Sequence, residues 1–570
     1  MWKIYVIFFI LCISCNYEGR RDMSNLPVEE CDTIQISNLH LLCKVWGFMK
    51  YYHPDIANGM YDWDNELFEI MPRVVNIKSK KERNRVLSKW INKYDIPTSC
   101  NKSLSDTQMP NVKTYPDISW IENKEELGEV SDLLLNMKYL ERNCVGLSVG
   151  GDLYKDYCYL EFSEDEKKVF FKNENDYKEL KEIKNKYSLL ALFRIWNVIQ
   201  YYYPYKYLID KKWDDVLFEY IHKFASVKSL LEYKLLILMV LTEVEDTHMN
   251  LWDEDIQNWI GNRKALVNVE FVENSFVVTG VYDKYYKKVP LEIGDVILKI
   301  DGRCVQNIIE EKKMYISASN NAVLMREISL QLLFTDKEKL HIEYLRNNQL
   351  LSDSVETYYY KSIKNNGNRR RYKPLFEYID EDVAYVYPGS LFSGKIPDQI
   401  NTKGLIIDLR DYPNQKNIKE YLEFYHLYNE SKESVLFTYG SSTWPGLFTY
   451  SYTTVVGKKN ENSYKGLVII LVDEGTQSHG EYMAMRYRCA PNSIILGSTT
   501  AGTDGGVVRL ALPGGIYVPV GIQGVYYPDG RETQRIGIVP DIWMEPTIKG
   551  IREGRDEVLE KAIELINEIE

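Results

Sequence analysis

Ser478 lies at a point in the sequence where a serine could act as a nucleophile. It follows the short, β-branched apolar run Leu467–Val472 and a polar turn, and a helical pattern comes after it. The first N–H groups of a helix have no partner inside the helix, so they can stabilise the oxyanion formed when a serine attacks a carbonyl. Ser478 and Glu481 also fit the Ser-x-x-Glu capping box, which needs no chemistry. These residues alone leave both interpretations open.

A nucleophilic serine needs a base, usually histidine or lysine. No lysine lies between Lys465 and Lys549, which excludes a Ser–Lys dyad built within this segment. Histidine is scarce, with seven in the chain. His248 lies in a polar turn, Asp246-Thr-His248, where a helical pattern ends just before predicted strands. Sites often collect in turns at domain boundaries. Taken alone, His248 also fits a histidine that stabilises the C-terminus of a helix.

The elements that must position Ser478 form an α/β region, which we place over residues 370–570. Its predicted strands are Val383–Tyr387, Leu405–Asp408, Leu467–Val472 and Ser493–Leu496. An amphipathic helix is predicted over 556–567, with its apolar residues on one face.

Short alternating strands precede this region, over residues 262–360. Within them, Pro290–Gly302 contains a Gly-Asp turn that enters a strand ending at Asp-Gly. This run resembles the signature of a PDZ-like domain. Domains of that kind bind extended peptide C-termini by adding a strand to a sheet edge. The resemblance therefore favours polypeptide partners, although such a unit can also be a spacer.

The N-terminal part contains an internal duplication with an offset of 150 residues, from Trp46 to Trp196. Residues 38–70 and 188–220 each read as a helix, an aromatic corner ending in proline, and a second helix. Two copies are too few for a solenoid, so we predict a duplicated helical packing unit. An aromatic binding surface is the alternative. The first copy belongs to a domain over 16–180, with a small β element at 110–180, and the second copy spans 181–260.

Length and composition bound the remaining possibilities. A chain of 570 residues is too long for one core, and its net charge of −12 argues against nucleic-acid binding. The cysteines lack the spacing of a metal site, and we predict no metal and no cofactor. Export would permit a disulfide, for which Cys144 and Cys158 are the nearest pair.

The first 15 residues form a short apolar run behind one positive charge, which predicts a secretory signal. Ser14-Cys15 is similar to the end of a bacterial lipoprotein signal, in which Cys15 would be lipidated. A plain signal peptide and an uncleaved anchor are the alternatives. The protein is therefore expected in the cell envelope, anchored in a membrane at the periplasm or the outer membrane.

Five motifs together resemble the C-terminal-processing (tail-specific) serine proteases. In order they are Asp246-Thr-His248 before the PDZ-like unit, Leu405–Arg410, Thr476–Glu481, Gly497–Gly502 and Gly537–Asp541. The resemblance covers residues 240–565. It implies that Ser478, three residues before Glu481, is the nucleophile. Many members carry a lysine where this chain has Thr503. This departure implies the tricorn-like branch, whose base is a histidine located before the PDZ-like unit, and His248 matches that place.

The same resemblance also implies which residues form the oxyanion hole and which residue orients His248. Members often have glycines after Asp-Leu-Arg, whereas here Pro413 follows and has no N–H. The backbone N–H of His479 is one expected donor, and the second is unassigned. Asp408 and Arg410 are expected to form a buried structural pair. The residue that orients His248 is expected to be Gln534, with Glu532 as the alternative. If neither has a function, both are simply polar residues of an exposed hairpin.

The sequence thus predicts a multidomain α+β protein: a helical N-terminal region with an internal duplication, a PDZ-like β domain and an α/β protease core. The expected function is a serine endopeptidase that acts on exported polypeptides. Two alternatives remain. One is a peptide-binding lipoprotein whose protease core has decayed, and the other is a hydrolase of a different ester or amide. Oligomeric state is not predicted.

Overall fold

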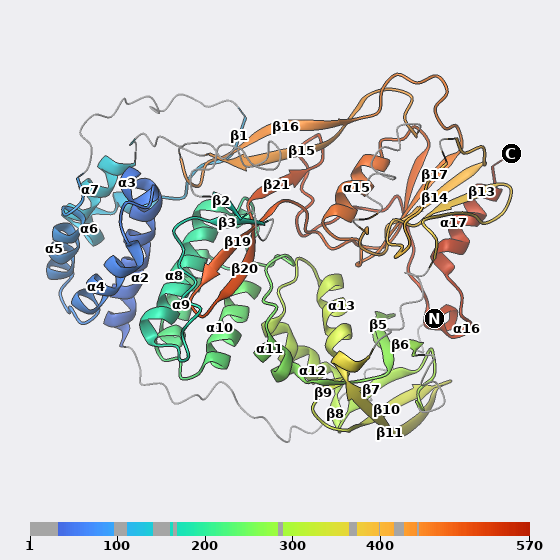
Figure 1. Cartoon of the computed structure of the whole chain (residues 1–570), viewed down its shortest axis with the longest axis horizontal. Helices are drawn as coiled ribbons and strands as arrows, with labels where there is room; N and C mark the ends of the chain where they lie inside the picture. The colour runs from blue at the N-terminus through green and yellow to red at the C-terminus, as the bar shows by residue number, and fades with distance from the viewer. Residues whose placement is uncertain are drawn as a thin grey trace.

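The computed structural model describes residues 32–95, 111–138, 140, 160–163, 168–282, 289–363, 373–397, 399–414, 416, 427–441 and 444–569. The expected signal segment with Cys15, and the pair Cys144 and Cys158, lie outside the described residues. The N-terminal helices are at one end of the molecule and the parallel sheet is at the other (Figure 1). Within the described ranges, no helix has the length and apolar character needed to cross a membrane.

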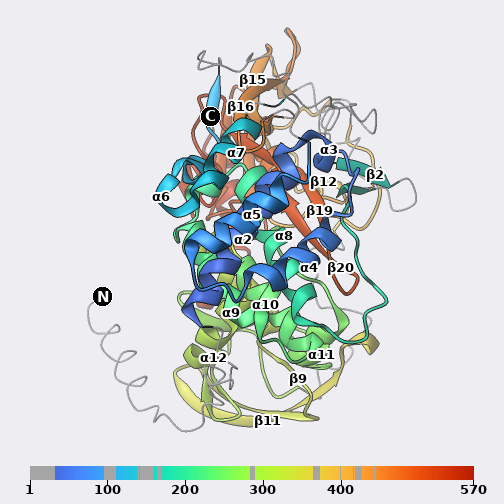
Figure 2. The ribbon, with the colours of Figure 1, turned by 90° about the vertical axis from the view of Figure 1, so that its left-hand side faces the viewer.

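Two helical segments make up the N-terminal end, onto which Figure 2 looks. The first contains α2 (Thr33–Tyr52), α3 (Pro54–Ala57), α4 (Trp63–Val74), α5 (Lys80–Ile91), η1 (Ser119–Glu122), α6 (Lys124–Leu127) and α7 (Glu129–Met137). The second contains α8 (Asn185–Tyr202), η3 (Lys206–Leu208), α9 (Trp213–Ala225), α10 (Leu230–Thr242) and α11 (Glu254–Ile260). Asp32 caps α2 through its side chain, and proline follows the end of both long helices, α2 and α8, within two residues.

The repeated sequence motif makes the same contacts in both segments. The indole N–H of Trp46 donates to the carbonyl of Trp63 at 3.0 Å, and that of Trp196 donates to the carbonyl of Trp213 at 2.7 Å. Helices α2 and α8 pack closely at Gly47, where an added Cβ would overlap Asn197. The aromatic corners are buried in this shared core. Because they are buried, these corners are packed helix corners, as predicted, and not an exposed binding surface.

An antiparallel β domain follows. Its elements are β4 (Arg263–Ala265), β5 (Val267–Val272), β6 (Ser275–Val281), β7 (Val296–Ile300), β8 (Arg303–Cys304), α12 (Val305–Lys312), η5 (Lys313–Tyr315), α13 (Asn321–Gln331), β9 (Phe334–Thr335), β10 (Lys339–Arg346), β11 (Gln349–Tyr359) and η6 (Tyr360–Ser362). The sheet order is β5-β6-β7-β10-β11-β4-β9, and β8 pairs with β7. Gly294 turns the chain into β7 at φ 89°, and Asp295 beside it accepts from Arg346 at 2.8 and 2.6 Å.

The C-terminal core is a six-stranded sheet in the order β12-β13-β14-β17-β18-β22, parallel except for β12. Its strands are β12 (Phe376–Tyr378), β13 (Val383–Val386), β14 (Gly404–Asp408), β17 (Leu467–Val472), β18 (Ser493–Gly497) and β22 (Ile542–Trp543). Helix α15 (His479–Tyr487) covers one face, and α17 (Glu557–Asn567), which follows α16 (Ile548–Glu553), covers the other. Alternate residues of β17 face the two helices: Ile470 packs with α15, and Ile469 packs with α17. The four predicted strands and the terminal helix are confirmed.

Two further sheets join the helical end to the core. One has the order β1-β16-β15-β21, from β1 (Val112–Thr114), β15 (Lys432–Gly440), β16 (Phe448–Val456) and β21 (Gln523–Tyr526). The other has the order β2-β3-β19-β20, from β2 (Leu160–Ser163), β3 (Lys168–Phe171), β19 (Val507–Leu512) and β20 (Ile516–Gly521). Strands β15 and β16 span the distance from the core to the helices (Figure 1). The β element expected at 110–180 is therefore completed by strands of the C-terminal half.

Candidate active site

Ser478 is at the corner between β17 and α15, beyond the carboxyl end of a parallel strand. Its φ is 51°, in a region that side chains other than glycine rarely adopt, so the turn holds it in a strained conformation. The turn is fixed to the neighbouring strand, because the hydroxyl of Thr476 donates to the carbonyl of Leu409 at 2.8 Å. A serine on a sharp strand-to-helix turn is exposed above the sheet, where a substrate can reach it.

Glu481, three residues later, ties this corner to a second loop. Its buried carboxylate accepts from the backbone N–H of Ser478 at 3.1 Å and from the N–H groups of Gly502 and Thr503 at 2.7 and 3.0 Å. The hydroxyl of Thr500 adds a fourth bond at 2.5 Å. The bond between Glu481 and Ser478 belongs to the capping box that the sequence suggested. The cap and a chemical role for Ser478 are therefore compatible.

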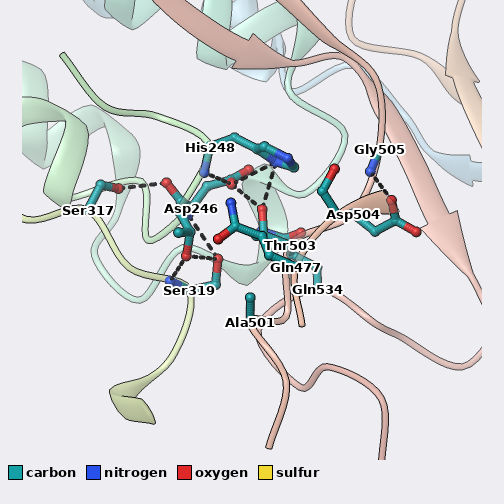
Figure 3. A network of polar contacts seen from close by, with 12 residues as sticks. Asp246, His248, Ser317, Ser319, Gln477, Ala501, Thr503, Asp504, Gly505 and Gln534 are labelled. Atoms are coloured by element: carbon teal, nitrogen blue, oxygen red, sulfur yellow. Dashed lines mark hydrogen bonds and ion pairs between the residues drawn. The ribbon is translucent and has the colours of Figure 1, made fainter. Parts of the chain in front are cut away.

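His248 lies in the turn after α10 and contacts Thr503 and Asp246 (Figure 3). Its Nδ1 is 2.7 Å from Oγ1 of Thr503 and 3.5 Å from Oδ1 of Asp246. The Thr503 hydroxyl donates its proton to Asp246 at 2.6 Å. A hydroxyl has one proton, so its contact with His248 makes Nδ1 the donor there. This arrangement leaves the lone pair of the neutral ring on Nε2.

Thr503 also connects His248 with Ser478. Its backbone carbonyl accepts from the N–H of Ser478 at 3.0 Å, while its hydroxyl contacts His248. The structure thus brings Ser478 and His248 together on either side of one residue. Thr503 stands where many of the proteases that the chain resembles carry a lysine.

Asp246 is held from several sides. Its backbone carbonyl accepts from Ser317 at 2.8 Å (Figure 3). Its Oδ2 accepts from the hydroxyl of Tyr203 at 3.0 Å. Its Oδ1 also accepts from the backbone N–H of His248 at 2.9 Å. Tyr203 comes from the aromatic corner after α8, so the helical end of the molecule takes part in orienting His248.

The three carboxyl groups near His248 differ in pKa. Burial raises the pKa of Asp504 to about 8 and also raises the pKa of Glu481. Burial acts in the same direction on Asp246, but its bonds to His248 and Thr503 outweigh that effect and lower its pKa. For His248, burial favours the neutral ring, yet the hydrogen bond and charge of Asp246 raise the pKa above its ordinary value. Of these three carboxyl groups, only Asp246 has a lowered pKa.

Gln534 and Glu532 do not occupy the place expected of them. The side-chain amide of Gln534 donates to Tyr203 at 3.3 Å, so it reaches Asp246 only through that hydroxyl. Glu532 binds Lys113 and Tyr207, each at 2.7 Å. Beside Nδ1 of His248 lie Oγ1 of Thr503 at 2.7 Å and, at 3.5 Å, Oδ1 of Asp246, which is in the same tight turn as His248. An aspartate often accepts the backbone N–H of the residue two positions later in a turn, so the spacing of Asp246 and His248 could have predicted this pair.

The residues expected around the oxyanion hole lie at the start of α15 and in the loop after β14. His479 is the first residue of α15, and its ring stacks on Tyr482 at 5.8 Å. The loop that follows β14 lies beside the start of α15, because a Cβ added to Gly480 would be 3.8 Å from Cδ of Pro413. Asp408 and Arg410 form the expected buried pair, and Arg410 also binds Asp556 at 2.7 and 2.8 Å. Their partners confirm a structural role.

The β domain contacts the Ser478 corner through α13. The guanidinium of Arg326 donates to the carbonyl of Glu474 and to the side-chain oxygen of Gln477 at 2.9 Å. Asn320, which caps α13, donates to the carbonyl groups of Thr500 and Ala501 at 2.8 and 3.2 Å. Helix α13 therefore holds both loops that meet at Ser478.

Residues 394–544 match the family model described as peptidase family S41. No curated protein sequence matches the chain. Mature CPAF in complex with lactacystin is similar in structure, with a TM-score of 0.53 and 13% identity over 67% of this chain and 99% of its own. Mature CPAF alone gives a TM-score of 0.51 and 13% identity over 68% and 98%. The photosystem II D1 C-terminal processing protease gives 0.35 and 15% identity over 65% and 98%.

At these identities the CPAF structures show a shared fold. The family match covers β14, Ser478, Glu481 and Thr503, while His248 lies before it. The chain thus contains a peptidase domain of family S41, the C-terminal-processing serine proteases, and is a peptidase.

Proposed function

We propose that the protein is an exported serine endopeptidase in which Ser478 is the nucleophile, His248 the base and Asp246 the residue that orients the base. The observation that carries the proposal is the shared contact with Thr503, whose backbone carbonyl accepts from the N–H of Ser478 and whose hydroxyl contacts His248. The assignment of the ring proton to Nδ1 supports it, because Nε2 then has the lone pair that a base requires.

In the proposed reaction, Ser478 Oγ attacks the scissile carbonyl while Nε2 of His248 takes its proton. Asp246 stabilises the imidazolium that forms. Collapse of the tetrahedral intermediate breaks the C–N bond, and His248 returns the proton to the leaving amine. Water then hydrolyses the acyl-enzyme by the same steps. The backbone N–H of His479, at the start of α15, is the proposed first donor to the oxyanion.

We propose further that the β domain is PDZ-like and holds the extended polypeptide substrate. Its position supports this role, because α13 contacts both loops at Ser478. The two matching helical segments are proposed to derive from a duplication, as their identical tryptophan contacts suggest.

The proposed location is the cell envelope, with Cys15 as the lipidated anchor. Cys304 is disulfide-bonded, whereas Cys43 and Cys489 are free thiols. A disulfide favours an oxidising compartment and so supports export.

A fluorophosphonate probe tests the nucleophile, because it phosphonylates only an activated serine. We expect labelling of the wild-type protein and none of Ser478→Ala, together with loss of peptide hydrolysis. Ser463→Ala, a buried serine away from the site, is the control and should label normally. A folded wild-type protein that neither labels nor cleaves a proteome-derived peptide library would support the decayed, peptide-binding alternative.

A further inference from the structure

Thr503 is a buried residue whose backbone is fixed to the corner that carries Ser478. The N–H of Thr503 donates to the carboxylate of Glu481 at 3.0 Å, and its carbonyl accepts from the N–H of Ser478 at 3.0 Å. Both partners belong to the strand-to-helix turn and the first turn of α15. The hydroxyl of Thr503 therefore has a fixed position relative to the nucleophile.

This hydroxyl bridges the ring of His248 and the carboxylate of Asp246 (Figure 3). Its Oγ1 is 2.7 Å from Nδ1 of His248 and 2.6 Å from Oδ1 of Asp246. The direct distance from Nδ1 to Oδ1 is 3.5 Å, which exceeds the range of about 2.7–3.2 Å for an N–H···O hydrogen bond. The lowered pKa of Asp246 keeps its carboxylate ionised at neutral pH, so it accepts the single hydroxyl proton. The short route from the ring to the carboxylate therefore runs through Thr503.

We propose that Thr503 is a positioning residue, whose hydroxyl keeps the ring proton of His248 on Nδ1 so that Nε2 can accept the proton of Ser478. The inference rests on the proposed roles of Ser478 and His248. Because the hydroxyl proton goes to Asp246, Oγ1 offers only lone pairs to the ring, and a ring must carry a proton on Nδ1 to bind there. When Nε2 takes the proton of Ser478, the Nδ1 proton and the hydroxyl proton both stay on their own atoms. Asp246 then stabilises the imidazolium through the bridging hydroxyl as well as through its charge.

Thr503→Val tests the role, because valine keeps the shape of threonine and removes the hydroxyl. Asp246 is then too distant, at 3.5 Å, to hold the Nδ1 proton, so the neutral ring can carry its proton on Nε2 instead. A positioned general base contributes about 10²- to 10⁴-fold to a rate. We expect the lower end of that range, a loss of about 10²-fold in kcat with a nearly unchanged KM. Thr503→Ser keeps the hydroxyl and should stay within about threefold of wild type.

Thr402→Val is the matched control. Thr402 is also buried, and its hydroxyl donates to the carbonyl of Gly404 at 2.8 Å, at the amino end of β14. Ser478 lies beyond the carboxyl end of β17, which runs parallel to β14, so the control is at the opposite edge of the sheet. The substitution should leave kcat unchanged.

The position of the ring proton is a second readout, which a merely structural role would not move. Nitrogen-15 NMR of histidine-labelled protein distinguishes a ring nitrogen that carries a proton from one that carries a lone pair. The spectra are taken without substrate and above the pKa of the ring, and His248→Ala identifies the signals of His248. We expect the proton on Nδ1 in wild type and Thr503→Ser, and on Nε2 or on both nitrogens in exchange in Thr503→Val.

The outcomes separate this inference from the proposed function. If wild type turns over, Ser478→Ala does not, and Thr503→Val stays within about threefold of wild type, then Asp246 alone orients the base and the inference fails. It also fails if Thr503→Val loses activity while the ring proton stays on Nδ1, because Thr503 is then only structural. If Ser478→Ala retains wild-type turnover, the proposed function and the inference fail together. Matching circular dichroism and melting temperature for Thr503→Val and wild type exclude misfolding as the cause of a loss.

Discussion

The imidazole of His248 has its charge state set by one carboxylate. Its pKa is raised because the hydrogen bond and charge of Asp246 outweigh burial, which acts in the opposite direction. A base must be neutral to accept the proton of Ser478, so activity should rise with pH as the imidazolium loses its proton. Since the pKa lies above the ordinary histidine value of about 6.5, the acid limb of kcat/KM should lie above that pH as well.

Asp246→Asn tests this assignment. The substitution removes the charge that raises the pKa, so the acid limb should move to lower pH while kcat falls by about 10²- to 10⁴-fold. A pH series of kcat/KM on wild type and variant measures both effects. His248→Ala should lose about as much as Ser478→Ala, because the groups act as a unit. An acid limb that does not move in Asp246→Asn would remove Asp246 from the mechanism.

The residues of the site differ in how well sequence could predict them. Ser478 and His248 stand in motifs with local patterns, a strand-to-helix corner and a turn after a helix. Asp246, the partner of His248, lies two residues earlier in the same turn, which is a local signal, whereas the family resemblance points to Gln534. Gln534 is predicted to face the ring, yet Tyr203 from a distant helix end lies between its amide and Asp246. Thr503 gains its importance only from its contacts with Asp246 and His248.

Helix α13 is the element that couples the β domain to the peptidase core. Its Arg326 reaches the carbonyl of Glu474 and the side chain of Gln477 in the turn just before Ser478. Hydrogen bonds that involve a charged group contribute about 1.5–3 kcal/mol each. Because the turn stays tied to Leu409 through Thr476, losing Arg326 should loosen the turn without unfolding it.

We therefore expect Arg326→Met to lower kcat/KM by about tenfold, since a small displacement of a nucleophile is costly. Hydrogen exchange of peptides covering residues 473–478 should become faster. Arg303→Met, at an exposed arginine of the same domain, should change neither quantity. Unaltered exchange and activity in Arg326→Met would show that α13 does not support the turn.

Four of the six core strands, β13, β14, β17 and β18, are predicted from sequence to within a residue, because they are buried and read as continuous apolar runs. The strand at 467–472 is an example, with Ile469 and Ile470 both fully buried. Strands β15, β16, β19 and β20 are not predicted. They pair locally, β15 with β16 and β19 with β20, but their other partners are distant in the chain: Val112 of β1 lies opposite Thr449, and Phe170 of β3 lies opposite Arg509. Local patterns do not specify such partners.

At the scale of the whole molecule, one buried arginine joins the helical end to the strands of the C-terminal half. The guanidinium of Arg194, on α8, forms ion pairs with Asp64 of α4 and with Glu174. It also donates to the carbonyl of Ala511 in β19 at 2.7 Å. Parts of the chain more than 300 residues apart are thus bound to a single side chain. This arrangement predicts that the two ends unfold together.

Arg194→Met should lower the free energy of unfolding by about 3–5 kcal/mol, because it leaves the buried carboxylate of Asp64 without its cation and leaves Glu174 with Lys50 alone. Chemical denaturation followed by tryptophan fluorescence, which reports mainly on the helical end, should show the loss. Ser478-directed probe labelling across the same denaturant series, which reports on the core, should fall at the same lowered midpoint. Arg555→Met, which breaks an exposed ion pair, should leave both midpoints unchanged. If the fluorescence midpoint falls and the labelling midpoint does not, then the helical end unfolds independently of the peptidase core.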